Sequence, residues 1–332
     1  MRIIDGKKIA EKIIENLKTR PAPKKIFAAV LIGNNKISES FLKQKEKIAK
    51  ELEVDFRIYR FPDSSAGELK NDDLRKEVGR IALMKKVGGV IVQLPLPENL
   101  NAQYILNAIP REKDIDVLGE RALGAFYADR NPVLPPAVET IIEILKEPAA
   151  LFEKSVSEAE RAWFPSEARK SEAKSQGASE RLGERNPVFS KIKPLAIAVI
   201  GAGFLIGKPV SVWLMNQKIK ELTIFEKGSD LSELKNYDLI ISGVGQAGII
   251  RPEMLKEEAG VIDFGYSTPT ARSRANADLM QTDAEISKLV GDFDISQLSN
   301  VKSHLSFYTP TPGGTGPILI AKIFENFYKL NS

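Results

Sequence analysis

The sequence contains no cysteine and a single histidine, His304, among its 332 residues. Without cysteine the protein has no disulfide, no thiolate nucleophile and no zinc or iron–sulfur site with cysteine ligands. With one histidine, only His304 could serve in a Ser–His–Asp triad, and a metal site built from several histidines is excluded. We therefore expect no metal site. We interpret His304, in a segment rich in serine and lysine, as a surface residue.

The sequence also has no large excess of charge of either sign and no long apolar run. The 48 Lys and Arg residues against 44 Asp and Glu give a net charge of +4, too small to indicate nucleic-acid binding. The uncharged stretch over 194–207 is too short to span a bilayer and is interrupted by glycines. Asp5, Lys7 and Lys8 stand where a signal peptide needs an apolar core. We expect a cytoplasmic enzyme that binds neither nucleic acid nor a membrane.

Short apolar runs and amphipathic segments alternate along most of the chain. Runs of this length, bounded by glycine or polar residues, are typical of strands buried in a parallel sheet. The alternation therefore predicts an α/β fold of two domains with parallel sheets. The expected strands lie over 26–32, 54–59, 89–93, 195–200, 222–225, 239–241 and 260–262, and the expected helices over about 9–17, 40–52, 66–86, 208–215 and 317–330.

The composition changes sharply near Pro148. From 153 to 185 the chain consists mainly of Ser, Ala, Glu, Lys and Arg, and a segment this polar buries too little surface to offset the entropy of ordering. We interpret 148–190 as a polar, low-complexity insertion or linker. A basic interaction arm is less favoured, because the charges of this segment roughly cancel.

A glycine-rich turn follows the expected strand over 195–200. Gly201, Gly203 and Gly207 form a Gly-x-Gly-x-x-x-Gly pattern, and Lys208 and Pro209 continue into a helix. Glycines at these places let the backbone turn tightly and approach a pyrophosphate, whose charge lies at the helix N-terminus. The pattern predicts a dinucleotide site in this second half. The alternative is a purely structural glycine turn.

An acid, Glu226, closes the next expected strand. At this place of a dinucleotide site an acid hydrogen-bonds the adenosine ribose and repels a 2′-phosphate, which favours NAD over NADP. Lys227 complicates this inference, because its ammonium could reach a phosphate.

One lysine lies on the apolar face of the expected helix over 40–52. Phe41, Lys45, Ile48 and Leu52 are spaced at i, i+4, i+7 and i+11, which places them on the core-facing stripe. A lysine there either extends to solvent or lines a cleft, where desolvation lowers its pKa and suits it to proton transfer. The residue pattern leaves both interpretations open.

Three further segments could reach a ligand. Gln93 ends a strand at the carboxyl edge, where ligands bind in open α/β sheets, although it could simply cap the strand. Asp114 and Asp116 lie in a charged loop, and such loops are usually solvated. The segment over 309–317, rich in glycine and proline, opens a helix whose first amides could bind an anion or a polar ligand edge.

Taken together, these segments resemble the bifunctional methylenetetrahydrofolate dehydrogenase/cyclohydrolase family. The most specific pair of motifs is Gln-Leu-Pro-Leu-Pro at 93–97 and Pro-Gly-Gly-Thr-Gly-Pro at 312–317. The resemblance covers nearly the whole chain apart from the insertion. Further matches lie at 5–7, 40–45, 113–116, 201–209, 230–231, 244–245, 261–265 and 289–292.

The resemblance implies a two-domain α/β enzyme, usually a homodimer, with its active cleft between the domains. We expect a folate-binding catalytic domain over 1–145, completed by the helix over 317–330, and a Rossmann-like NAD(P)-binding domain over 191–300. The implied reactions are oxidation of 5,10-methylene-tetrahydrofolate to the methenyl form with NAD or NADP, and its hydrolysis to 10-formyl-tetrahydrofolate.

The resemblance also implies roles for individual residues. Lys45 corresponds to the catalytic lysine that serves the proton transfers of hydrolysis, Gln93 to the glutamine that tunes it, and Asp116 to the acid that anchors the pterin ring. The implied substrate-binding residues are Phe41, Leu94, Pro95, Pro312, Gly313 and Gly314. The implied cofactor-binding residues are Gly201, Ala202, Gly203, Gly207, Lys208, Pro209, Glu226, Gly243, Val244 and Gly245.

Four residues depart from the family pattern near the substrate. Phe41 stands where the family has a tyrosine, and Val117 replaces the glycine after the pterin-binding aspartate. Val133 and Leu134 replace the Cys-Thr of the usual Pro-Cys-Thr-Pro. These changes predict a weakened hydrolase step. Val117, Val133 and Leu134 also suggest a dehydrogenase that has drifted to another substrate. A different alternative is a non-catalytic descendant that binds a dinucleotide, or binds a partner through the polar insertion.

Two further departures concern the cofactor. Ala202 and Gly203 replace the Arg-Ser that commonly helps to hold the 2′-phosphate of NADP. Together with Glu226, these changes favour NAD.

Overall fold

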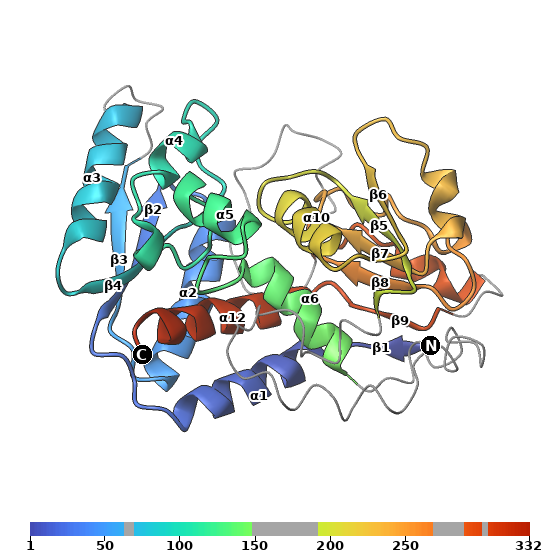
Figure 1. The fold of residues 1–332 in the computed structure, drawn as a ribbon, viewed down its shortest axis with the longest axis horizontal. Helices are drawn as coiled ribbons and strands as arrows, with labels where there is room; N and C mark the ends of the chain where they lie inside the picture. The colour runs from blue at the N-terminus through green and yellow to red at the C-terminus, as the bar shows by residue number, and fades with distance from the viewer. Residues whose placement is uncertain (63–69, 148–191, 268–288, 301–304) are drawn as a thin grey trace, which may run out of the picture.

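The computed structural model describes residues 1–62, 70–147, 192–267, 289–300 and 305–332. The expected insertion over 148–190 and His304 lie outside these residues. Helices and parallel strands form two α/β halves that lie side by side (Figure 1). The expected two-domain α/β fold with parallel sheets is therefore confirmed.

The first half is built on a sheet of three parallel strands in the order β3-β2-β4. Its strands are β2 (Ile26–Ile32), β3 (Phe56–Phe61) and β4 (Val87–Val92). Every residue of β2 and β4 is buried, which explains their continuous apolar sequences. The third strand begins two residues later than expected, because its pairing with β2 starts at Phe56 opposite Phe27.

In the described part of the chain up to Glu147, six helices surround this sheet or follow it. They are α1 (Gly6–Lys18), α2 (Lys36–Glu51), α3 (Asn71–Leu83), α4 (Ala102–Leu106), α5 (Glu120–Tyr127) and α6 (Pro136–Lys146). The second of them starts four residues before the expected position. Asn35 caps it by accepting a hydrogen bond from the backbone N–H of Ser38 at 2.9 Å.

The second half contains a sheet of six parallel strands in the order β1-β9-β8-β7-β5-β6. Its strands are β1 (Arg2–Ile3), β5 (Ala196–Ile200), β6 (Glu221–Phe225), β7 (Leu239–Ser242), β8 (Gly260–Asp263) and β9 (Phe307–Tyr308). The two-residue strands β1 and β9 were not expected, because such short segments show no periodicity. Strand β1 brings the N-terminus of the chain to this second sheet.

Helix α10 (Gly207–Asn216) packs on the second sheet. Four short 3-10 segments among the described residues connect other elements of the two halves. These segments are Arg111–Lys113, Leu231–Asn236, Pro252–Met254 and Ile295–Asn300.

The last helix, α12 (Thr315–Leu330), returns to the first half of the molecule. It packs against α1, α2, α6 and β4, and Figure 1 shows it in red beside the blue α1. The Phe27 ring lies 5.3 Å from that of Phe324 and 5.0 Å from that of Phe327, measured between centroids. The C-terminal helix thus fills the core beside β2 with aromatic side chains.

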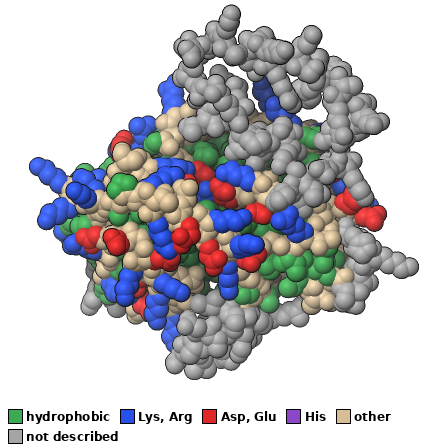
Figure 2. All heavy atoms as spheres, turned by 90° about the horizontal axis from the view of Figure 1, so that it is seen from below, with side chains coloured by type: hydrophobic (Ala, Val, Ile, Leu, Met, Phe, Trp, Pro, Cys, Tyr) green, Lys and Arg blue, Asp and Glu red, His purple; other side chains and the backbone are tan. Residues whose placement is uncertain are grey.

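Acidic and basic side chains are intermixed over the face of the molecule seen in Figure 2, in keeping with the small net charge. Within the described ranges, no helix has the length and apolarity needed to cross a membrane.

Candidate functional site

The lysine on the apolar stripe of α2 is buried against the end of β4. Lys45 is only 5% exposed, so it does not extend to solvent. Its Nζ donates a hydrogen bond to Oε1 of Gln93 at 2.8 Å. Gln93 follows the last residue of β4, and its own amide nitrogen donates to the carbonyl of Leu94 at 3.0 Å. That bond orients the glutamine so that its oxygen faces the lysine.

Asp116 completes a group of three polar residues that are distant in sequence. Burial lowers the pKa of Lys45 to about 8, and the Asp116 carboxylate opposes part of that shift. Burial raises the pKa of Asp116 to about 6, and the Lys45 ammonium opposes this shift in turn. Both groups therefore titrate near neutral pH, which suits proton transfer.

The loop that carries Asp116 is organised by its neighbour Asp114. Asp114 is only 1% exposed, so its interpretation as part of a solvated loop is wrong. Its carboxylate accepts hydrogen bonds from the backbone N–H groups of Leu118 at 3.1 Å and Gly119 at 2.7 Å. Burial raises the pKa of Asp114 to about 7. The sequence did not predict the burial of Asp114, because it depends on hydrogen bonds from backbone N–H groups four and five residues later, which leave no periodic pattern of apolar residues.

Val117 adopts a backbone conformation that glycine tolerates more readily than valine. Its φ of 56° lies in the left-handed region, which is costly for a β-branched residue. The side chain is fully buried, so packing offsets this cost.

Phe41 lies one turn before Lys45 on α2 and is half-buried. Its ring makes an edge-on contact with Tyr266, with centroids 5.4 Å apart. Tyr266 belongs to the second half of the molecule, three residues after the end of β8. The expected substrate-binding residue Phe41 therefore lies where the two halves meet.

The expected substrate-binding residues Leu94 and Pro95 follow directly after Gln93. Leu94 is half-buried and Pro95 is exposed. The Leu94 carbonyl also accepts a hydrogen bond from the hydroxyl of the buried Ser38, at the start of α2, at 3.4 Å.

The segment over 309–317 is folded into the structure between α1 and β8. A Cβ at Gly6 would overlap the carbonyl oxygen of Gly314, so the first residue of α1 packs directly on this segment. The Thr315 hydroxyl donates to the carbonyl of Asp263 at 2.8 Å. Gly313 has a φ of 100°, while Pro312 is exposed. Only part of the segment is therefore exposed.

The glycine-rich turn closes tightly between β5 and α10. A Cβ at Gly207 would overlap the carbonyl oxygen of Gly201, whose φ is 90°. Gly203 faces open space, and its carbonyl accepts a hydrogen bond from the N–H of Lys208 at 2.9 Å. Pro209 is buried in the first turn of α10. A strand, a tight turn and a helix N-terminus in this order are what a dinucleotide pyrophosphate requires.

Glu226 and the expected glycines of the next loop lie at the same edge of the sheet. The pairing of Ile200 with Phe225 brings the residues that follow them, Gly201 and Glu226, next to each other. Glu226 is exposed. The loop after β7 begins at Gly243, where a Cβ would press on the Ile206 side chain.

Asp292, a buried acid, holds the loop after β7 in place. It lies in the segment 289–292 that resembles the family, but the resemblance assigned it no role. Asp292 accepts hydrogen bonds from the Ser242 hydroxyl at 2.6 Å and from the N–H groups of Val244 and Gln246, both at 2.7 Å. These bonds set the path of the expected cofactor residues Val244 and Gly245, both of which are exposed. No metal-type cluster of three His, Cys, Asp or Glu side chains occurs among the described residues.

Models of one protein family match both halves of the chain. The catalytic domain of tetrahydrofolate dehydrogenase/cyclohydrolase matches residues 4–116, and the NAD(P)-binding domain of the same family matches residues 186–332. The bifunctional protein FolD of Staphylococcus haemolyticus is 28% identical over 333 aligned residues, which cover 98% of this chain and 95% of that protein.

Solved structures share the fold over the full length. The FolD enzyme of Campylobacter jejuni superposes with a TM-score of 0.74 at 23% identity, covering 100% of this chain and 98% of that one. The Trypanosoma brucei enzyme, solved with NADP and an inhibitor, gives 0.71 at 21% identity, covering 99% and 96%. The chain belongs to the bifunctional tetrahydrofolate dehydrogenase/cyclohydrolase family and is an enzyme with a catalytic and an NAD(P)-binding domain.

Proposed function

We propose that Lys45, Gln93 and Asp116 are the polar machinery with which this chain performs the reactions of its family. These reactions are the oxidation of 5,10-methylene-tetrahydrofolate to the methenyl form and the hydrolysis of that form to 10-formyl-tetrahydrofolate. The observation that carries the proposal is the 2.8 Å hydrogen bond between the buried Nζ of Lys45 and Gln93. A buried lysine with a pKa of about 8 can take up and release a proton at neutral pH.

Hydrolysis depends on Lys45 in this proposal. Its neutral amine accepts a proton as a water oxygen bonds to the methenyl carbon. It then gives that proton to N5 as the bond between this carbon and N5 breaks, and the second water proton leaves to solvent. Gln93 holds the amine in place, while Asp116 binds the pterin ring.

Oxidation needs alignment more than proton transfer. A bound NAD(P)+ would supply the hydride acceptor, and the nitrogen lone pairs of the folate would stabilise the cation formed. The chain contributes Phe41 and Leu94 on the folate side. Its turn between Gly201 and Gly207 and the loop after Gly243 bind the dinucleotide.

Replacing Lys45 by Met tests this division. We expect Lys45→Met to reduce hydrolysis by at least about a hundredfold, the usual size of a general-base contribution, and hydride transfer far less. The assay follows NAD(P)H formation and methenyl accumulation in the same reaction. Lys47→Met, an exposed lysine on the same helix, is the control. Equal loss of both steps in a folded Lys45→Met protein would contradict the proposal.

For the cofactor, we propose a preference for NAD over NADP. Support comes from the acid Glu226 next to Gly201, and from Ala202 and Gly203, which offer no cation to a 2′-phosphate. We expect Glu226→Ser to raise kcat/KM with NADP relative to NAD by about tenfold, because a repelled phosphate becomes tolerated. Glu221→Ser, at the other end of β6, should leave the ratio unchanged. An unchanged ratio in Glu226→Ser would remove Glu226 from cofactor selection.

We further propose that the chain forms a homodimer and acts in the cytoplasm. The family resemblance supports the dimer, and light scattering would detect it as twice the chain mass of 36.7 kDa. For the domains, we propose boundaries at 1–145 with 317–330, and at 191–300, joined by the segment over 148–190. Limited proteolysis should cut first within 148–190. A monomeric mass, or first cuts elsewhere, would contradict these proposals.

A further inference from the structure

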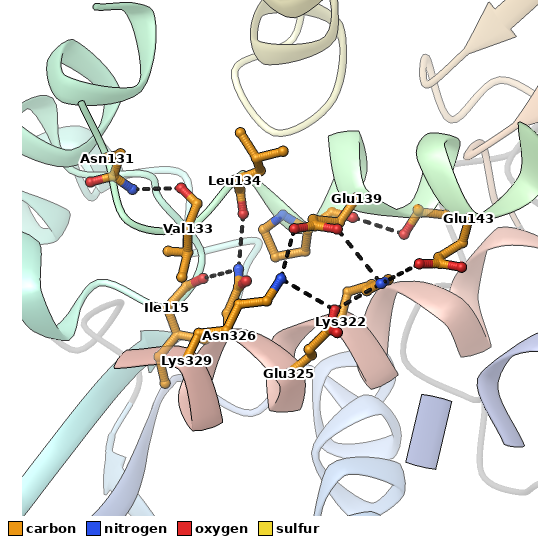
Figure 3. Close-up of polar contacts among 12 residues, drawn as sticks. Ile115, Asn131, Val133, Leu134, Glu139, Glu143, Lys322, Glu325, Asn326 and Lys329 are labelled. Atoms are coloured by element: carbon orange, nitrogen blue, oxygen red, sulfur yellow. Dashed lines mark hydrogen bonds and ion pairs between the residues drawn. The ribbon is translucent and has the colours of Figure 1, made fainter. Parts of the chain in front are cut away.

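The C-terminal helix reaches the loop that carries Asp116. Asn326, in the interior of α12, is fully buried. Its side-chain nitrogen donates to the carbonyl of Ile115 at 3.1 Å and to the carbonyl of Leu134 at 2.9 Å (Figure 3). We propose that Asn326 is a positioning residue for the reaction, which holds the Asp116 carboxylate at its distance from Lys45.

The first hydrogen bond acts one peptide group away from Asp116. The carbonyl of Ile115 belongs to the peptide bond that links Ile115 to Asp116, so the bond restrains the backbone from which the carboxylate extends. On the other side, Asp114 holds the same loop through Leu118 and Gly119. The backbone that carries the Asp116 side chain is therefore restrained on both sides.

The second hydrogen bond ties this loop to the segment before α6. Leu134 lies between Pro132 and Pro135, and the adjacent Val133 carbonyl accepts a hydrogen bond from Asn131 at 2.8 Å. One amide nitrogen thus restrains two loops at once, which requires a side chain that donates two N–H bonds from one atom.

The remaining atom of this amide argues against a role in packing alone. Among the described residues, no donor reaches the buried Oδ1 of Asn326. Leaving such an atom unsatisfied costs free energy, and an apolar side chain of the same shape would avoid that cost. Compared with an apolar side chain of the same shape, asparagine therefore contributes the two hydrogen bonds donated by its side-chain nitrogen.

A group of charges, here called the α6–α12 clamp, fixes the helix that carries Asn326. It consists of Lys322, Glu325 and Lys329 on α12 with Glu139 and Glu143 on α6 (Figure 3). The ammonium of Lys322, whose side chain is 3% exposed, lies 2.7 Å from both Glu143 and Glu325. The clamp residues of α12 lie both before and after Asn326. They therefore restrain α12, and with it the side-chain nitrogen of Asn326, from sliding along α6.

Displacing the loop would alter two measurable properties. The inference rests on the proposed roles of Lys45 and Asp116. If Asp116 moves away, Lys45 loses the carboxylate that opposes the lowering of its pKa, so this pKa falls further below 8. The folate also loses its anchor. Binding of the substrate should therefore suffer more than hydride transfer.

Replacing Asn326 by Leu removes both donors at nearly constant volume. We expect KM for 5,10-methylene-tetrahydrofolate to rise about tenfold, as for the loss of a pair of ordinary hydrogen bonds, with kcat for hydride transfer within about twofold. The pH midpoint of hydrolysis should fall by about half a unit. An unchanged KM and midpoint in the folded variant would overturn the proposal. If Asn326→Leu does not fold, Asn326→Ser, with a single hydroxyl donor, is judged by the same criteria.

Asn331→Leu is the matched control. Asn331 follows the last residue of α12, and its amide donates to the carbonyls of Gly88 at 3.2 Å and Phe327 at 2.8 Å rather than to the carbonyl of Ile115 or Leu134. We expect a lower Tm with KM and the pH midpoint unchanged. The same shifts in Asn331→Leu would overturn the proposal, because they would follow from loosening the helix in general.

Asp116→Asn, measured alongside, separates this inference from the proposed site. It should lower the pH midpoint in the same direction, because it removes the carboxylate itself. A shift in Asp116→Asn without one in Asn326→Leu would overturn the positioning role alone. No shift in Asp116→Asn would overturn the proposed site and the positioning role with it.

Discussion

Lys45 shows what burial does to a single side chain. A lysine on an apolar stripe commonly carries its ammonium to solvent, but at 5% exposure Lys45 does not. The cost of desolvation appears as a pKa lowered to about 8, partly opposed by Asp116, and the hydrogen bond to Gln93 compensates in part. Its position on the helix was readable in advance, whereas its chemistry depends on two residues from other segments.

Changing Gln93 to Glu should reverse this tuning. A carboxylate beside the Lys45 ammonium favours the charged form, so the pKa of Lys45 should rise by at least about one unit. Hydrolysis, which needs the neutral amine, should then fall about tenfold at pH 7 and recover at higher pH. The measurement is a pH profile of methenyl hydrolysis.

Gln217→Glu, at the end of α10, adds the same charge away from the site and should leave this profile unchanged. A Gln93→Glu profile identical to that of the unmodified enzyme would show that Lys45 does not set the pH dependence.

At the scale of elements, the start of α10 shows how closely a helix approaches a strand. Gly207→Ala would drive a methyl group into the Gly201 carbonyl, so the helix N-terminus must move from the pyrophosphate site. We expect the Kd for the dinucleotide to rise at least about tenfold by calorimetry, together with a lower Tm.

Gly124→Ala, in α5, is the control because open space surrounds that position. Alanine is the better helix former, so this variant should be stabilised by about 0.5 to 1 kcal/mol, with cofactor binding unchanged. Retained dinucleotide affinity in Gly207→Ala would contradict the close-packing argument.

Most elements longer than three residues were predictable, but the helices α4, α5 and α6 were not expected. Several of the other failures have physical causes. The start of α2 was missed because a side-chain cap at Asn35 extends the helix beyond its apolar stripe. Asp114 was missed because its partners are backbone amides, which carry no sequence signal. Strands β1 and β9 exist because each pairs with a strand already in the sheet.

At the scale of the molecule, the α6–α12 clamp tests how the chain holds its C-terminal helix in place. Burial alone would raise the pKa of Glu143 and Glu325, but Lys322 lowers both below their usual values. Lys322→Met leaves these carboxylates buried without their shared partner. We expect a loss of about 3 to 5 kcal/mol in the free energy of unfolding at pH 7.

The loss should shrink below about pH 4.5. Acids with a depressed folded pKa stabilise the protein above their unfolded pKa, and this contribution disappears as they become protonated. Lys146→Met removes a partner of the same Glu143 whose side chain is 44% exposed, and should cost less than about 1 kcal/mol. Denaturant unfolding at pH 7 and pH 4 measures both variants. Equal losses for the two lysines would contradict the burial argument.

The sequence alone determined the alternation of strands and helices, the glycine turn before α10 and the family resemblance, because these depend on local spacing and backbone freedom. The tertiary structure decided that Lys45, Gln93 and Asp116 meet, that Asp114 is buried, and that Asn326 on the last helix reaches the loop of Asp116. Such contacts join residues far apart in the chain. Their distances depend on how whole elements pack, and no local pattern records that packing.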